Sequence, residues 1–104
     1  MKSTKRKQLE KAGWRSGSAE EFLGLKPEES ALVNMRLSLA ETLRSRRNRA
    51  GLSQSDLARR LGSSQSRVAK MEAGEASVSL DLLVRAMLAT GAKPSDVGHA
   101  IAAA

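Results

Sequence analysis

Apolar residues recur at helical spacing along most of the chain, and no stretch alternates with the period of two that is typical of a strand. The longest predicted helix covers residues 27–49, because Pro27 suits a first helical position and acidic residues follow it. Its apolar stripe consists of Leu32, Met35, Leu39 and Leu43. At ~1.5 Å per residue this helix is longer than a minimal domain requires. We therefore expect its first half to need another surface: an N-terminal helix, a second subunit or a different protein.

Two short helices joined by a tight turn are predicted by the stretch that starts at Ser53 and ends at Gly74. Ser53 is a good N-cap, and Asp56 lies three residues on, where it can accept a hydrogen bond from the amide of the cap. Gly62 ends the first helix, because glycine adopts the left-handed backbone of a helix C-terminus at little cost. Ser64 caps the second helix. Helices this short must pack on neighbours to be stable, and the pattern is that of a helix-turn-helix.

Further helices are predicted on both sides of this pair. Residues 18–21 form a capping-box sequence that begins a short helix. Ser77 or Ser79 can cap a helix after the pair, and Pro94 begins a last one. The inward-facing residues of these two later helices are expected to be Leu80, Leu83, Val84, Met87, Val97 and Ile101. Five or six helices with short connections predict a compact all-α bundle.

Composition excludes several functions. The chain has 104 residues, enough for one small domain, and only 2% of them are aromatic, so the core must be aliphatic. It has no Cys, which excludes a disulfide framework and thiolate catalysis. His99 is the single histidine, and Ser66 and Lys70 lie one helical turn apart without an oxyanion hole or cleft beside them. We expect a protein that is not an enzyme and that binds neither a metal nor a cofactor.

The formal net charge is +7, and the positive charge is concentrated in two regions. Residues 1–17 carry a net charge of +5 and residues 35–74 carry +6, whereas the rest of the chain is weakly acidic. This distribution suits a polyanion such as DNA, with binding that weakens as salt rises. A membrane surface is the rival polyanion, but no basic helix with a large apolar face and no apolar run of membrane-spanning length is present. The charge therefore favours nucleic acid.

The second helix of the pair carries a row of polar residues outside its apolar stripe. The row consists of Gln65, Ser66, Arg67 and Lys70. Their side chains have the donors, acceptors and length that suit base edges and phosphates. Arg67 lies in the first turn, where a cation costs a few tenths of a kcal/mol, and a nearby phosphate would reverse the sign of that interaction. A solvated polar face is the alternative, but the capped helices and the basic surroundings favour DNA.

Specific motifs carry a resemblance to a known family. They are Leu-Ser-Gln at 52–54, Leu-Gly-Ser-Ser-Gln-Ser at 61–66, Met-Glu-Ala-Gly at 71–74 and Ser-Leu-Asp-Leu-Leu at 79–83. With them, residues 37–92 resemble the lambda-repressor/Cro (XRE-type) helix-turn-helix family. The segments 20–29, 63–74 and 77–86 are similar to HigA-like antitoxins of bacterial toxin–antitoxin pairs. The resemblance implies a lambda-repressor-like fold with an N-terminal extension.

The resemblance and the polar row together give roles to individual residues. Base contacts are expected from Gln65, Ser66 and Lys70. Phosphate contacts are expected from Gln54, Ser64, Arg67 and Arg47. The resemblance also implies that Arg47 pairs with Glu72 and holds the long helix against the second helix of the pair. These assignments place DNA at the beginning of the second helix.

Three parts of the chain are distinguished. Residues 1–17 are expected to form a flexible basic arm, residues 18–36 a helical extension with the start of the long helix, and residues 37–104 the DNA-binding domain, with the helix-turn-helix at 53–74. The basic arm can follow DNA or can simply be solvated. Trp14 within it can fold back onto a groove or anchor a protein partner.

The resemblance implies a cytoplasmic bacterial repressor that binds a palindromic operator as a homodimer and neutralises a cognate toxin. The toxin would contact Trp14, Phe22 and Leu23, which are apolar residues outside the domain. Either the last helix or the long helix can supply the dimer interface. Two alternatives remain open: a phage-type transcriptional regulator without a toxin, and a protein-interaction module whose DNA-binding face has lost its function.

Overall fold

The computed structural model describes residues 24–104. The expected arm at residues 1–17, the helix expected at 18–21 and the residues Trp14, Phe22 and Leu23 lie outside the described residues. Between residues 24 and 104 the elements are α3 (Pro27–Arg49), α4 (Gln54–Leu61), α5 (Gln65–Glu72), α6 (Leu80–Ala89) and α7 (Pro94–Ala102), and no strand is present. The predicted all-α fold is confirmed.

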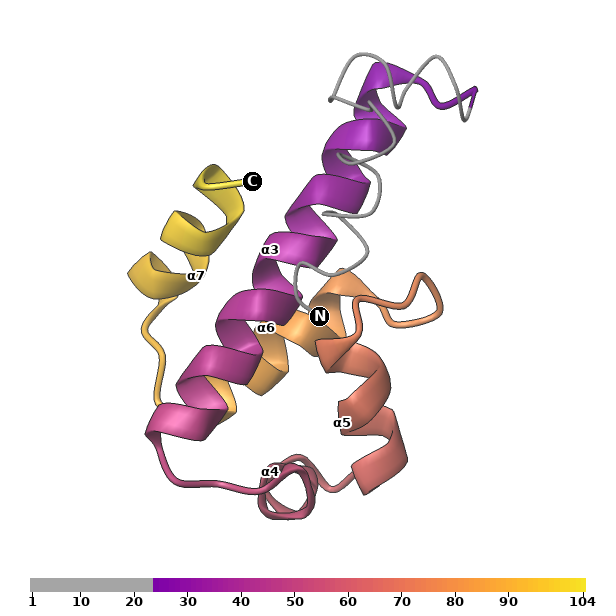
Figure 1. Cartoon of the computed structure of the whole chain (residues 1–104). Coiled ribbons are helices and arrows are strands. Elements are labelled where there is room, and N and C mark those ends of the chain that lie inside the picture. The colour runs from indigo at the N-terminus through magenta and orange to yellow at the C-terminus, as the bar shows by residue number, and fades with distance from the viewer. Residues whose placement is uncertain (1–23) are drawn as a thin grey trace.

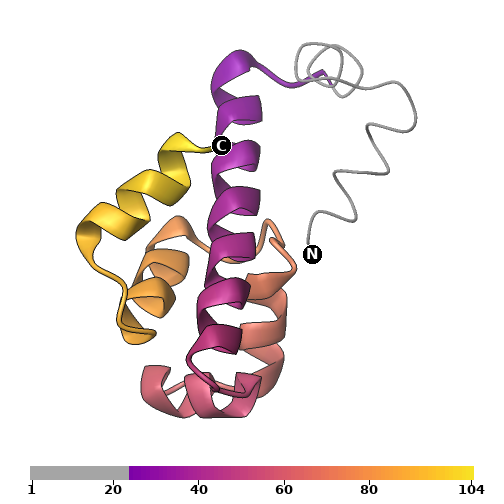
Figure 2. The same cartoon turned by 60° about the vertical axis from the view of Figure 1, so that its left-hand side comes forward.

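Helix α3 runs through the molecule and the other helices gather around its C-terminal half. Figure 1 shows α7 and α5 on opposite sides of α3, with α6 behind it. In Figure 2, α6 and α7 lie on one side of α3, α5 lies on the other, and α4 crosses near the end of α3. The helix begins at Pro27, with Glu28 and Glu29 in its first turn, and the amide of Lys26 donates a 2.9 Å hydrogen bond to Glu29 Oε1. It ends at Arg49, as the sequence predicts. The helix-turn-helix is thus packed against one long support.

The core between the helices is aliphatic, with two methionines. Its fully buried members are Leu39, Leu43, Leu57, Val68, Met71, Leu83 and Met87. The apolar stripe predicted for α3 is correct for Leu39 and Leu43, but Met35 is half-buried and Leu32 is 40% exposed. Leu32 lies in the first half of α3, for which the sequence predicts that another surface is needed, and its exposure agrees with that prediction. Val33, beside it, is also exposed.

Both short helices have the predicted ends. The amide of Asp56 donates to Ser53 Oγ at 3.0 Å, and the amide of Ser53 donates to Asp56 Oδ2 at 2.9 Å. The backbone amide of Ser53, followed by its hydroxyl, lowers the pKa of Asp56. Gly62 has φ of 65°, the left-handed conformation expected after α4. Ser64 Oγ accepts a hydrogen bond from the amide of Arg67 at 3.2 Å and so caps α5.

Helices α6 and α7 cover the other side of α3. Ser79, rather than Ser77, caps α6, because its hydroxyl accepts the amide of Leu82 at 3.1 Å. Leu83, Met87 and Val97 are buried as predicted, whereas Leu80, Val84 and Ile101 are half-buried at the edge of the core. Ser38 Oγ on α3 donates to the carbonyl of Ala100 at 2.5 Å and ties α7 to α3.

Candidate nucleic-acid interface

Helix α5 divides its residues sharply between the core and solvent. Val68, Met71 and Glu72 are buried, and the residues that the sequence assigns to DNA point outward. Gln65, Ser66, Arg67 and Lys70 are all exposed, and we call these four residues the polar face of α5. The N-terminus of α5 carries the partial positive charge of the helix dipole and so attracts anions. The helix therefore presents hydrogen-bonding groups and positive charge in one direction.

A buried ion pair positions α5 against α3. Arg47 Nε lies 2.5 Å from Glu72 Oε2, and Arg47 Nη2 lies 3.0 Å from Glu72 Oε1. The remaining nitrogen of Arg47 donates to the carbonyl of Leu52 at 2.8 Å. The pair implied by the resemblance is present. The Arg47 side chain is only 11% exposed and all its nitrogens have partners, so this geometry corrects its assignment as a phosphate contact.

Hydrogen bonds continue from this ion pair to the polar face of α5. Gln54 Nε2 donates to Glu72 Oε1 at 3.1 Å, and Gln65 Nε2 donates to Gln54 Oε1 at 2.5 Å. The amide of Gln54 is therefore used within the protein, and it fixes the side chain of Gln65. Sequence reasoning missed this connection because its members are 11 and 18 residues apart in the chain.

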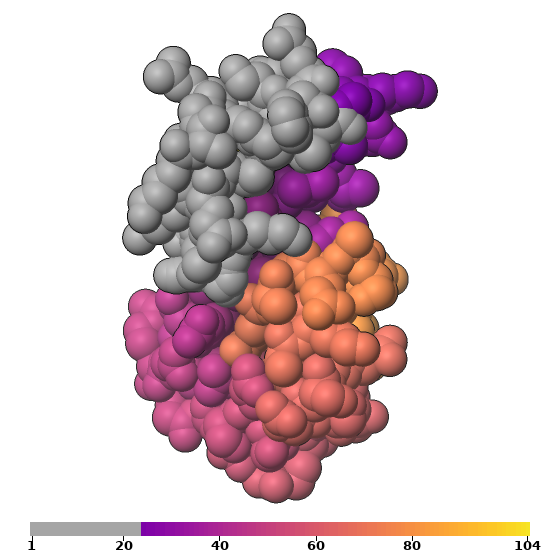
Figure 3. Space-filling view, turned by 45° about the vertical axis from the view of Figure 1, so that its right-hand side comes forward, coloured from indigo at the N-terminus to yellow at the C-terminus, as the bar shows by residue number. Residues whose placement is uncertain are grey.

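A polar groove of about 250 Å³ lies between α5 and the segment that follows it. It is lined by Ser64, Ser66, Arg67, Lys70, Ser77 and Val78. In Figure 3, α4, α5 and the segment after α5 form one continuous surface in the lower half of the molecule. Ser77 is a groove residue that sequence reasoning did not assign to DNA, because nothing local to residue 77 shows that the chain returns alongside α5.

Two cations of this groove have no acidic partner in the part of the chain that the structure describes. Among residues 24–104 the ion pairs are Arg46–Asp96, Arg47–Glu72 and Arg59–Asp56. Arg67 and Lys70 belong to none of them, and they share the groove with three hydroxyl groups. Unpaired cations beside serine hydroxyls at a helix N-terminus form an arrangement suited to a phosphate group.

The sequence model of the helix-turn-helix domain family matches residues 38–100, which is more than half of the chain. The chain belongs to the helix-turn-helix domain family. No curated protein and no solved structure matches it significantly. The matched region runs from the middle of α3 to α7 and includes the whole polar face of α5. This helix-turn-helix protein is a DNA-binding regulator, with DNA as a partner.

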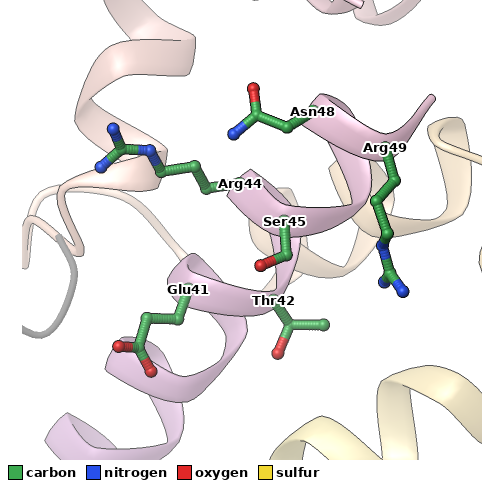
Figure 4. Close-up of a pocket in the computed structure, with 6 residues that line it drawn as sticks. All are labelled: Glu41, Thr42, Arg44, Ser45, Asn48 and Arg49. Carbon is green, nitrogen blue, oxygen red and sulfur yellow. The ribbon is translucent and has the colours of Figure 1, made fainter. Parts of the chain in front are cut away.

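A second depression lies on α3, away from the polar face of α5. This depression of about 560 Å³ is lined by Glu41, Thr42, Arg44, Ser45, Asn48 and Arg49, all on α3. In Figure 4 the two arginines of this depression point away from each other, so their charges do not converge on one anion. Among residues 24–104 no cluster of His, Cys, Asp or Glu could hold a metal ion, and no helix is long and apolar enough to cross a membrane.

Proposed function

We propose that this helix-turn-helix protein is a sequence-specific transcriptional repressor of XRE type. The observation that supports this proposal is the polar face of α5. There Gln54 holds the side chain of Gln65, and Arg67 and Lys70 have no acidic partners among the described residues. A preorganised glutamine suits adenine, which offers an acceptor and a donor in the major groove. The cations add affinity that does not depend on sequence. In this proposal the protein acts by binding and not as an enzyme.

A homodimer follows from the same proposal. One α5 spans only a few base pairs, which gives too little discrimination in a genome, whereas two copies on a two-fold operator double the contacts. Leu32 and Val33 on α3 are exposed apolar residues that a second subunit can cover, and α7 is the other helix proposed for the interface. We place the dimer in the bacterial cytoplasm on a palindromic operator.

Binding to DNA is tested by selecting duplexes from a random pool with the full-length chain. The proposal expects recovery of a palindromic sequence and binding that weakens steeply between low and physiological salt. A protein-interaction module without a functional DNA face would enrich no sequence and shift no duplex at low salt. That result would reject the repressor assignment.

We further propose that the protein is the antitoxin of a type II pair and neutralises a toxin encoded beside it. The support is the similarity of residues 20–29, 63–74 and 77–86 to HigA-like antitoxins. Trp14, Phe22 and Leu23 are the proposed toxin contacts, and they lie outside the described residues. The product of the neighbouring gene should stop the growth of cells that express it alone, and co-expression of this protein should restore their growth. Restored growth after deletion of residues 1–24 would reject these contacts, and a neighbouring product that is not toxic would favour a phage-type regulator.

A further inference from the structure

The segment that follows α5 returns alongside it because of one glycine. We call residues 73–79 the groove loop. Gly74 has φ of +70°, and a Cβ at this position would lie 2.9 Å from Leu37 Cδ2 on α3. A side chain would therefore be strained by the backbone and obstructed by α3. This close approach directs the groove loop past α3, and the amide of Glu75 donates back to the carbonyl of Lys70 at 3.2 Å.

A single arginine from α3 holds the groove loop near its end. Arg36 Nη1 donates a hydrogen bond to the carbonyl of Val78. Val78 is buried in the core, and its amide donates to the carbonyl of Glu75 at 3.0 Å. Ser77 therefore lies between Glu75 and Val78, which are both held by hydrogen bonds, and it lines the groove. The hydroxyl of Ser77 lies 3.5 Å from Glu75 Oε1, the limit of a hydrogen bond, so a stronger acceptor can take it.

We propose that Arg36 is a positioning residue for DNA binding: through Val78 it sets the groove loop so that Ser77, Arg67 and Lys70 hold one backbone phosphate. This inference rests on the proposed DNA-binding function and adds a residue outside the region that the family shares, because the match begins at residue 38. Arg36 itself does not contact DNA. Its guanidinium is half-buried against the backbone, and it takes part in none of the ion pairs formed within residues 24–104.

Arg36→Met tests the inference, because methionine keeps the apolar stem and removes the donor. The probe is a short duplex selected with the wild-type chain, together with a duplex of unrelated sequence. Loss of one positioned phosphate contact should weaken binding to both duplexes by roughly threefold to tenfold. The slope of log K against log salt should become shallower by about one. Ethylation of one phosphate, which interferes with wild-type binding, should no longer interfere, and Arg36→Lys should restore part of each effect.

Arg85→Met is the matched control, because Arg85 is an exposed arginine on α6 and forms none of the hydrogen bonds or ion pairs found among residues 24–104. It removes the same charge without touching the groove loop and should leave the salt slope and the interference pattern unchanged. Equal slopes for Arg36→Met and Arg85→Met would overturn the inference while leaving the DNA-binding function intact. A wild-type chain that binds neither duplex at low salt would overturn both.

A double-mutant cycle separates positioning from simple stabilisation. Ser77→Ala removes the hydroxyl from an exposed residue and should weaken both duplexes without changing thermal stability. If Arg36 acts through the groove loop, adding Arg36→Met to Ser77→Ala should cost less than the sum of the two single effects. Additive effects would overturn the inference, and so would normal binding by Ser77→Ala. Normal binding by Ser77→Ala would overturn the inference even if Arg36→Met did not fold.

Discussion

The two flanks of α3 are held by different kinds of contact. On the flank of α6 and α7, buried Leu39 and Leu43 meet apolar side chains such as Leu83 and Met87. On the flank of α5, Val68 and Met71 belong to the same core, and the buried Arg47–Glu72 ion pair, the close approach of Gly74 and the hydrogen bond of Arg36 to the groove loop are added to it. Both flanks thus pack through apolar area, and the flank of α5 also carries a buried ion pair held at two points.

This difference has a physical reason. Apolar packing depends on buried area and has little directionality, so it sets which side of α6 and α7 is buried but constrains the exact rotation of each helix less closely. A hydrogen bond weakens when its angle changes, and a guanidinium holding a carboxylate at two points fixes the rotation of the helix that carries it. Only α5 has to present particular side chains to a ligand in the proposed function. The ion pair that is held at two points is located on the flank where orientation matters.

The largest effect is expected from Arg47→Ala on the polar flank. The substitution leaves the carboxylate of Glu72 buried without its guanidinium, which typically costs about 3–5 kcal/mol of unfolding free energy. Urea denaturation followed by circular dichroism measures this loss. A cost below about 1 kcal/mol would mean that the pair does not position α5.

The double variant Arg47→Met/Glu72→Leu is the control for that experiment. Replacing both charges with apolar groups of similar size is often neutral or stabilising, by up to roughly 4 kcal/mol. We therefore expect a folded protein that has lost the bond from Gln54 to Glu72 and discriminates poorly between DNA sequences. Full discrimination by this variant would show that apolar packing can orient α5 equally well.

On the apolar flank, Leu43→Ala should cost about 2–5 kcal/mol, because it removes a fully buried side chain and leaves a cavity. The protein that remains folded should still choose between DNA sequences as the wild type does. Urea denaturation gives the stability, and competition between selected and unrelated duplexes gives the discrimination. Altered discrimination would contradict the division between a stabilising and an orienting flank.

The sequence predicted one of these flanks better than the other. Apolar spacing identified Leu83, Met87 and Val97 as buried, because periodicity reports which side of a helix faces a core. Local capping chemistry also located both short helices, since Ser53 and Asp56 act within three residues. Leu32 lies on the predicted stripe but is 40% exposed, because periodicity gives the face of a helix but not how far its neighbours extend.

The contacts that arrange the candidate site were mostly missed. The bonds of Gln54 to Gln65 and Glu72, and of Arg36 to Val78, join positions far apart in the chain. No local pattern marks such partners, and a polar residue at a helix surface has many available roles. Resemblance supplied the Arg47–Glu72 pair, which periodicity alone could not, whereas the cluster of arginines at the end of the long helix led to the assignment of Arg47 to phosphate. Long-range polar geometry required the structure.

A smaller effect, on binding rather than stability, should separate two residues of the polar face. Gln65→Ala should reduce discrimination at one base pair by about 1–3 kcal/mol. Arg67→Ala should weaken all sequences equally and make the salt slope shallower by about one. Competition binding with single-base variants of a selected duplex measures both effects. Equal behaviour of the two substitutions would show that the roles assigned to them are wrong.

The smallest effect concerns pH and compares Asp96 on α7 with Asp56 on α4. The pKa of Asp96 is lowered from its usual 3.8, first by the amide of Lys93, which donates to it at 2.8 Å, and then by Arg46. A lowered pKa means that the carboxylate stabilises the folded state above about pH 4 and that this contribution is lost as the pH falls below that value.

Asp96→Asn should therefore remove part of the acid sensitivity of α7 while changing little at neutral pH. Amide hydrogen exchange in α7 between neutral pH and pH 3 measures this, with Asp56→Asn as the matched variant for α4. If Asp96→Asn left the acid response of α7 unchanged, the stability of that helix would depend on its contacts with α3, such as the hydrogen bond from Ser38 to Ala100, and not on its cap.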